Sequence, residues 1–311
     1  MRAAVVVLLL VSQVCAASVG RAIEVMRVIG MDDDAQIMLH HPTDLNFASS
    51  GEAFVLNEGD GTIIRLNSDW SLVGQFGGLG EAPGKVSMPN GMVVFEDEIW
   101  VLSPWRFTVF SGNDGGYLRT IRLEEQVLAP RISHGKIVAT AREAAQMGVV
   151  IEPDGTLAHS FGPSCDPTPE GSLEGMLRCS EWIVLPAKTP GDAVLVDTYD
   201  GYGYLLHSNG EASTSVDLGL GRGWTEPGRM RFKSSIADMA SDGSGGFLAL
   251  AFPGNSARPR LYRYDESFNL SWHTDLPDEV LASEVRVSPR GEVCFVANSS
   301  SLIFVCRLSE P

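Results

Sequence analysis

The chain has 311 residues, of which 44% are hydrophobic and 20% are charged. This composition supports a folded core and excludes an intrinsically disordered protein. The formal net charge of −16 argues against nucleic acid and anionic membrane surfaces as partners, because both carry negative charge.

The first 17 residues have the pattern of a secretory signal peptide. Arg2 precedes the apolar run 3–11, which is too short to span a bilayer, and small residues follow it. Cys15 is a potential lipid anchor, but the bulky Val14 occupies a position where lipoprotein signals have a small residue. We therefore expect cleavage near Ala16 or Ala17 and no membrane span. The mature chain, residues 18–311, is then secreted or periplasmic and carries no lipid anchor.

The rest of the chain repeats a pattern of short strands and turns. Apolar strands of about five residues are separated by Gly-rich or Asp/Asn-containing turns, and Asn113-Asp114-Gly115 and Pro153-Asp154-Gly155 occupy the same place in successive units. Asn-Gly and Asp-Gly pairs between apolar runs indicate β-hairpins. Repeats of about 40–50 residues with several strands each are typical of propeller blades. The units begin near Pro42, Pro89, Pro130, Glu181, Ser235 and Glu284.

The two ends of the chain determine how the ring closes. The sixth unit has only three predicted strands, at 284–288, 292–297 and 302–308, while the segment 23–30 has no unit of its own. The segment ends on Ile29-Gly30, which matches the ends of the fourth strands of other units. We therefore predict an all-β fold: residues 18–311 form a single six-bladed β-propeller, and the N-terminal strand completes the last blade. Such closure removes open sheet edges.

Several segments of the chain resemble the repeats of a known family. The segments 42–51, 75–80, 83–84 and 88–94, with a second copy at 221–228, resemble the NHL-repeat family of six-bladed propellers. The resemblance extends from about residue 23 to residue 308. It implies the fold, and relatives include scaffolds, ligand-binding proteins and a few enzymes.

Polar residues near the starts of the first strands are expected to line the central channel, because first strands face the axis in this architecture. Their oxygen atoms would suit Ca²⁺ or Mg²⁺, or they would hydrogen-bond one another and the channel backbone. Asn90-Gly91 resembles an element of lactonase-like propellers, which hold an axial divalent cation. A metal-dependent hydrolase or lyase is therefore the alternative function. The axial candidates are Asp44, Asn90, Glu181, Asp238 and Glu284.

No catalytic residue and no cofactor is predicted, because the sequence contains no nucleophile elbow, P-loop or HExxH motif. The better candidate is the face that carries the connections between blades. Its Tyr, Trp and Arg residues are typical of binding hot spots, although aromatic residues also pack loops against blade ends. We expect a monomeric, non-enzymatic module that binds a protein, peptide or glycan there. The candidates are Trp105, Arg106, Tyr199, Asp200, Tyr202 and Trp224.

Four cysteines remain after signal-peptide removal, and an even number in an oxidising compartment favours disulfides over buried thiols. Cys165 and Cys179 flank a Pro/Gly-rich insertion, where a bridge would hold the loop. Cys294 and Cys306 are equally distant from Ser300, the expected centre of a hairpin, so they should face one another. The predicted bridges are 165–179 and 294–306.

Overall fold

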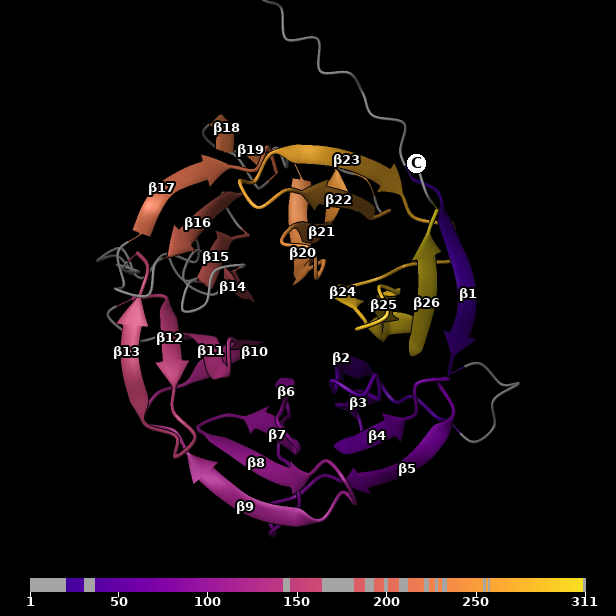
Figure 1. The fold of residues 1–311 in the computed structure, drawn as a ribbon, viewed down its shortest axis with the longest axis vertical. Helices are drawn as coiled ribbons and strands as arrows, with labels where there is room; N and C mark the ends of the chain where they lie inside the picture. The colour runs from indigo at the N-terminus through magenta and orange to yellow at the C-terminus, as the bar shows by residue number, and fades with distance from the viewer. Residues whose placement is uncertain are drawn as a thin grey trace, which may run out of the picture.

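The computed structural model describes residues 21–30, 37–141, 146–163, 182–187, 193–198, 201–206, 212–220, 224–226, 229–230, 234–253, 256 and 258–309. In these residues six antiparallel sheets of four strands each are arranged around a central axis (Figure 1). The predicted six-bladed β-propeller is therefore confirmed. No helix in the described part of the chain is long and apolar enough to cross a membrane.

Each blade runs from an inner strand beside the axis to an outer strand on the rim. Blade 1 contains β2 (Pro42–Phe47), β3 (Ala53–Asn57), β4 (Thr62–Leu66) and β5 (Leu72–Gly77). Blade 2 contains β6 (Gly91–Phe95), β7 (Glu98–Ser103), β8 (Arg106–Ser111) and β9 (Tyr117–Arg122). Blade 3 contains β10 (Val127–Ser133), β11 (Lys136–Ala141), β12 (Gly148–Ile151) and β13 (Leu157–Phe161).

The second half of the ring has the same order of strands. Blade 4 contains β14 (Trp182–Pro186), β15 (Ala193–Asp197), β16 (Tyr202–Leu206) and β17 (Ala212–Asp217). Blade 5 contains β20 (Ser234–Ser241), β21 (Phe247–Pro253), β22 (Arg260–Tyr264) and β23 (Leu270–Asp275). Blade 6 contains β24 (Glu284–Val287), β25 (Val293–Ala297), β26 (Leu302–Leu308) and, as its outer strand, β1 (Ile23–Ile29).

The chain ends close the ring as predicted. Strand β1 pairs antiparallel with β26, in a register that runs from Ile23 opposite Leu308 to Ile29 opposite Ile303. Beyond the ladder, the amide of Ser309 donates to the carbonyl of Ala22 over 2.9 Å. The N-terminal strand thus covers the edge of β26, which would otherwise present unpaired backbone groups.

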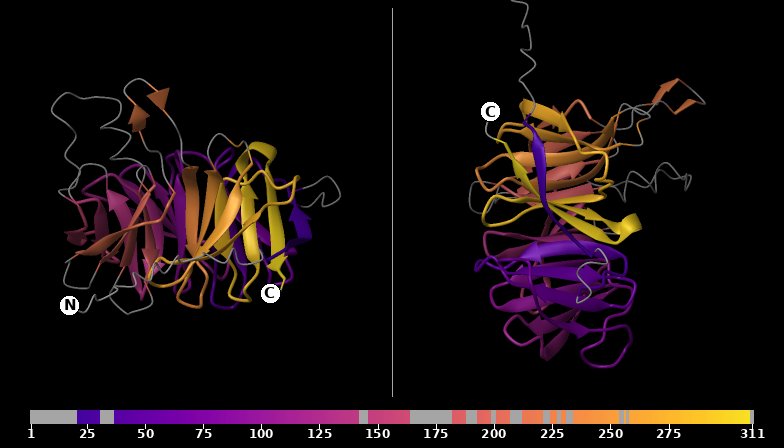
Figure 2. Two further views of the ribbon diagram at one scale, coloured as in Figure 1. Left: turned by 90° about the horizontal axis from the view of Figure 1, so that it is seen from above. Right: turned by 90° about the vertical axis from the view of Figure 1, so that its right-hand side faces the viewer.

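The ring has two faces, which differ in the connections that they carry. We call one the loop face: it carries the connections between blades and those between the second and third strands of each blade. The other, which we call the turn face, carries the turns between first and second strands and between third and fourth strands. A small hairpin of β18 (Trp224–Glu226) and β19 (Arg229–Met230) stands out from the ring on the loop face (Figure 2).

The hydrophobic core lies between neighbouring blades, not inside any one of them. Blades 2 and 3, for example, share a cluster in which Trp100 and Phe107 pack with Ile137 and Val149. Because a single sheet cannot bury its own faces, each blade depends on its neighbours for a dry interior. The packing surfaces therefore run around the ring and leave the central channel to the inner strands.

The predicted disulfide between Cys294 and Cys306 is wrong, because the register of the β25–β26 hairpin differs by one residue from the expected one. Cys294 lies opposite Val305, and Cys306 lies opposite Val293. The hairpin connection has an even number of residues, with the 3₁₀ turn Asn298–Ser300 followed by Ser301. A slip of one residue places two side chains on opposite faces of a sheet.

Both thiols are accordingly free and buried in separate clusters. Cys306 packs toward blade 5, and Cys294 packs toward blade 1. Burial raises the pKa of the Cys306 thiol to about 12 and the pKa of Cys294 well above its ordinary value. The other predicted pair, Cys165 and Cys179, lies outside the described residues.

Candidate binding face and central channel

The turn between β7 and β8 presents Trp105 on the loop face. Trp105 has a left-handed backbone with φ of 64° and is 46% exposed. Its carbonyl accepts a hydrogen bond of 2.9 Å from the amide of Leu123. The next residue, Arg106, donates from Nη1 to Oε2 of Glu81 over 2.7 Å. The bond to Glu81 holds the turn against the connection that leads from blade 1 to blade 2, and the bond from Leu123 holds it against the connection to blade 3.

That connection, residues 78–90, carries two exposed apolar side chains. Leu79 and Met88 belong to it and are 52% and 67% exposed. Gly84, in its middle, lies so close to Tyr117 that a Cβ there would be 3.2 Å from the Cβ of Tyr117. Glu81 of the same connection pairs with Arg106, the neighbour of Trp105, and we call Leu79, Met88 and Trp105 the blade 1–2 patch.

The exposed apolar side chains of the described chain are distributed unequally between the two faces. The described turns of the turn face carry no large exposed hydrophobic side chain. Five such side chains lie on outer strands at the rim: Met26, Val73, Tyr117, Leu118 and Leu270. The remaining six belong to the loop face: Met38, Leu79, Met88, Trp105, Tyr202 and Leu281.

The same face is acidic. In the described loops there, apart from the hairpin of β18 and β19, Lys85 and Arg258 are the two lysine or arginine side chains, and both are engaged: Lys85 donates to the carbonyl of Gly77 and Arg258 pairs with Asp278. The acidic side chains of these loops number seven: Glu58, Asp60, Glu81, Glu124, Glu125, Asp278 and Glu279. Hydrogen bonds from Ser87 and Arg106 hold the pKa of Glu81 below its usual range.

The other predicted loop-face residues fall in three places. Tyr202 begins β16 and is exposed, so it stands on the same face as Trp105. Trp224 lies on β18 in the projecting hairpin. Tyr199 and Asp200 lie outside the described residues. The binding role predicted for this set stays a prediction.

The mouth of the central channel on the loop face is shaped by bulges in three inner strands. The register shifts between Pro42 and Asp44 in β2, between Leu128 and Arg131 in β10, and between Ile236 and Asp238 in β20. A bulge re-aims the side chain that follows it and tolerates a proline, because it interrupts the ladder. In blade 3 the strand therefore begins at Val127, three residues before the predicted start at Pro130.

The three residues that follow these bulges, Asp44, Arg131 and Asp238, meet a second arginine in the channel. Arg286 on β24 donates from Nη2 to Asp44 over 2.6 Å and from Nη1 to Asp238. Its side chain is 9% exposed. Arg131 approaches from blade 3, across the ring, and its guanidinium lies 3.5 Å from Asp238 and 3.9 Å from Asp44. The cluster therefore links blades 1, 3, 5 and 6.

Each aspartate also ties neighbouring blades together through the backbone. Asp44 accepts from the amide of Met92 in blade 2 over 2.9 Å, and Asp238 accepts from the amide of Val285 in blade 6 over 3.0 Å. A carboxylate that accepts bonds from a guanidinium and from backbone amides has its lone pairs satisfied despite burial. These groups therefore have a structural use that requires no bound ligand.

Glu284 makes the cluster formally negative. Its Oε2 lies 3.2 Å from Nη2 of Arg286, which already binds the two aspartates. Burial raises the pKa of Glu284 well above its ordinary value, and the charges of Asp44 and Asp238 add to the effect, against the attraction of Arg286. Burial alone would lower the pKa of Arg286, but the three carboxylates outweigh it and raise that pKa. Arg286 therefore stays charged, whereas the ionised form of Glu284 is disfavoured.

The two arginines divide the channel into two chambers. A polar cavity of about 190 Å³ lies at the loop-face mouth, and a more apolar one of about 350 Å³ lies toward the turn face. Arg131 and Arg286 line both. Two buried polar atoms at this level have no partner in the described structure, Oγ1 of Thr43 and Nε of Arg286. We call the charged wall between the chambers the arginine partition.

The predicted axial residues do converge, but around the guanidinium of Arg286. Asp44, Asn90, Asp238 and Glu284 all line the loop-face chamber, whereas Glu181 lies outside the described residues. Within the described part of the chain, no group of three His, Cys, Asp or Glu side chains is placed to hold a metal ion. Sequence reasoning missed both arginines of the partition. A signal existed in the alternation Glu284-Val285-Arg286, which points residues 284 and 286 to one side of their strand.

Comparison with known proteins supports the fold. No protein-family model matches the chain, and no curated protein is similar to it in sequence. A putative exported protein from Bacteroides fragilis is similar in structure, with a TM-score of 0.62, 9% identity, and coverage of 93% of this chain and 96% of that one. A streptogramin B lyase is similar with a TM-score of 0.57 and 13% identity, covering 93% and 98%.

A third solved β-propeller is similar to the same degree. The β-propeller domain of Cps50 (Swd1) from Myceliophteria thermophila has a TM-score of 0.57, 11% identity, and coverage of 93% of this chain and 100% of that domain. At such low identities the likeness shows the propeller fold alone. The NHL-repeat assignment stays a prediction.

Proposed function

We propose that this chain is an exported, NHL-like propeller that works as a non-enzymatic binding module and docks a protein partner on its loop face. The observation that carries the proposal is the unequal distribution of exposed apolar side chains. Six lie on the loop face, and the described turns of the opposite face carry none. Apolar and aromatic side chains that stay exposed on one face mark interaction sites.

The backbone conformation of the blade 1–2 patch supports a binding role for it. Trp105 and Met88 both hold left-handed backbones, with φ of 64° and 48°, while their side chains are largely exposed. A large apolar residue in that conformation costs about 1–3 kcal/mol and buries little here in return. Strained residues that persist without a packing role are typical of functional sites.

The chemistry of the face favours a protein over a glycan. Two methionines and two leucines accompany the two aromatic side chains, and flexible aliphatic groups suit an apolar protein surface better than a polar sugar. Acidic side chains surround them. The expected partner therefore presents an apolar contact surface with basic residues around it, and its association should slow as salt screens the attraction.

Export is part of the same proposal. The predicted signal peptide places the mature chain outside the cytoplasm, and one similar structure is of a putative exported protein. The alternative function, a lactonase-like enzyme, would need Asp44, Asp238 and Glu284 to bind a divalent cation. Their oxygen atoms face Arg286, so a metal ion would have to displace a guanidinium held by three carboxylates.

The proposal is tested by affinity capture with matched variants. The mature chain is cross-linked to proteins of its host's exported fraction, and the bound proteins are identified by mass spectrometry. A variant carrying Met88→Ser and Trp105→Asn removes two side chains of the blade 1–2 patch, and Asn tolerates the left-handed backbone. The control is Met26→Ser, which removes an exposed methionine from the rim on β1.

We expect one or more proteins to bind the wild type and the Met26→Ser control equally, and to be depleted at least about tenfold on the double variant. The proposal is wrong if the double variant captures the same proteins in the same amounts. It is equally wrong if no protein is enriched by the wild type over an unrelated propeller.

A further inference from the structure

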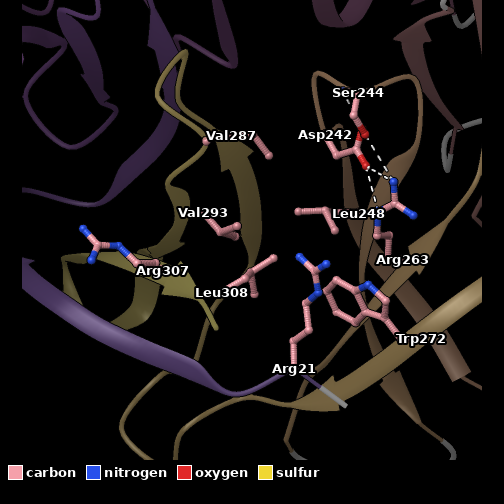
Figure 3. Close-up of a pocket in the computed structure, with 11 residues that line it drawn as sticks. Arg21, Asp242, Ser244, Leu248, Arg263, Trp272, Val287, Val293, Arg307 and Leu308 are labelled. Carbon is pink, nitrogen blue, oxygen red and sulfur yellow. Dashed lines mark hydrogen bonds and ion pairs between the residues drawn. The ribbon is translucent and has the colours of Figure 1, made fainter. Parts of the chain in front are cut away.

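A second candidate site lies on the turn face, between blades 5 and 6. It is a cavity of about 410 Å³, a size typical of small-molecule pockets (Figure 3). Asp242 and Ser244 come from the turn that joins β20 to β21, and Trp272 comes from β23. Arg21 and Leu308 come from the two ends of the chain, so the site spans the seam at which the ring closes.

On one side of the cavity, the guanidinium of Arg263 is neutralised by the carboxylate of Asp242. Arg263 contacts Asp242 through Nε at 2.9 Å and through Nη2 at 2.8 Å. Burial alone would raise the pKa of Asp242, but hydrogen bonds from Ser244 and Gly246 and the charge of Arg263 outweigh it and hold that pKa low. The pair is therefore ionised and satisfied.

Arg21, in contrast, has an uncompensated charge. Its guanidinium carbon lies 5.9 Å from the centre of the Trp272 ring, and no carboxylate in the described structure pairs with it. Figure 3 shows the guanidinium beside the indole, while that of Arg307 points away from both. Leu248, Val293 and Leu308 add apolar side chains to the lining, which also includes Arg307. In a chain with a net charge of −16, a guanidinium beside an indole ring, without a carboxylate partner among the described residues, is an unusual local feature.

From this arrangement we infer that the cavity between blades 5 and 6 binds a small organic carboxylate with an apolar or aromatic body. The carboxylate would pair with the guanidinium of Arg21, whose planar fork suits two parallel hydrogen bonds. The body would lie against Trp272 and the apolar wall. The site lies on the face opposite the loop face, so the inference does not rest on the proposed function.

Binding should also stabilise the seam. Ala22, next to Arg21, donates to Oγ of Ser309 and accepts from its amide, each over 2.9 Å. A ligand held by Arg21 and Trp272 would connect the N-terminal strand to blade 5 as well as to β26. Because a ligand that binds only the closed state favours that state, hydrogen exchange of the β1 amides should slow when the site is filled.

The test uses the mature full-length chain and phenylpropionate as the probe, with the neutral phenylpropanol as its partner. Binding is measured by calorimetric titration at low millimolar concentrations, and β1 is followed by hydrogen exchange. We expect phenylpropionate to bind at least about tenfold more tightly than phenylpropanol. Arg21→Gln should reduce that affinity roughly tenfold or more, while Arg307→Gln, which keeps the cavity and removes a guanidinium that points away, should leave it unchanged.

Several outcomes would overturn the inference: no binding of phenylpropionate at millimolar concentration, equal affinity for the alcohol, or equal effects of the two arginine variants. A melting temperature for each variant shows whether the chain is folded. If Arg21→Gln does not fold, phenylpropionate must still protect β1 in the wild type more than phenylpropanol does, and failure there also contradicts the inference. A negative result here leaves loop-face capture by Met88 and Trp105 unaffected.

Discussion

Replacing Arg286 with methionine tests whether the arginine partition holds the ring together. The side chain is 9% exposed and contacts Asp44 at 2.6 Å, Glu284 at 3.2 Å, and Asp238. Methionine keeps much of the aliphatic volume but leaves three carboxylates around one remaining guanidinium. Removing one partner of a buried ion pair costs about 3–5 kcal/mol. Because Arg131 stays 3.5 Å from Asp238 and partly compensates, we expect a loss of about 3 kcal/mol.

The loss should depend on pH in a defined direction. Without Arg286 the folded-state pKa of Glu284, which burial already raises, rises further above its unfolded value near 4. The folded variant then binds more protons than the unfolded chain between those values, so its stability falls as pH rises through this window. The difference between wild type and Arg286→Met should therefore be largest near pH 8 and shrink toward pH 5.

Equilibrium urea unfolding, followed by tryptophan fluorescence, measures both effects. The matched control is Arg290→Met in the same blade, whose exposed guanidinium lies 3.9 Å from Asp69. A pair of that kind contributes at most about 1 kcal/mol. The arginine partition does not hold the ring together if Arg286→Met costs no more stability than Arg290→Met at pH 8, or if its cost is the same at pH 5.

Three further predictions concern Glu284, the cysteines and the closure strand. Glu284→Gln should be more stable than wild type at pH 8, by about 1 kcal/mol for each pH unit by which folding raises the pKa of Glu284, and the gain should disappear as pH falls below about 4.5. Urea unfolding at both pH values measures the gain, and a gain that grows on acidification contradicts the prediction. Cys294 and Cys306 should resist a thiol reagent in the folded protein and both react after unfolding without reductant, as read by mass spectrometry; a persistent link between their peptides would show the register to be wrong. Deleting residues 18–30 should expose the edge of β26 and cause aggregation or loss of the cooperative transition in scanning calorimetry; an unchanged monomeric transition would mean that β1 is dispensable.

The fold could be predicted from the sequence because the patterns that indicate it are local. Asn-Gly and Asp-Gly turns occur at a fixed phase in each unit, and counting strands at the two ends identified the segment 23–30 as the missing strand of the last blade. Each of these signals acts within a few residues or within one hairpin. The ring then follows, because each blade must bury its faces against its neighbours.

The errors have physical reasons that are equally specific. The disulfide prediction required the hairpin register to the exact residue, and the 3₁₀ turn at Asn298–Ser300 shifts it by one. The acidic ring at the channel mouth was predicted, but its cation was missed. Arg131 reaches the aspartates from the opposite side of the ring, and such a contact has no short-range sequence signal. The cavity beside Arg21 was missed for the same reason, since it joins both chain ends to blade 5.

Site-specific photo-cross-linking tests whether the loop face docks a protein. A benzophenone side chain is placed at Met88 in one sample and at Met26 in another, two exposed methionines on the loop face and on the rim. Both samples are irradiated with the captured partner. We expect a covalent adduct from position 88 and none above background from position 26. Adducts from position 26 alone, or equally from both positions, would contradict docking on the loop face.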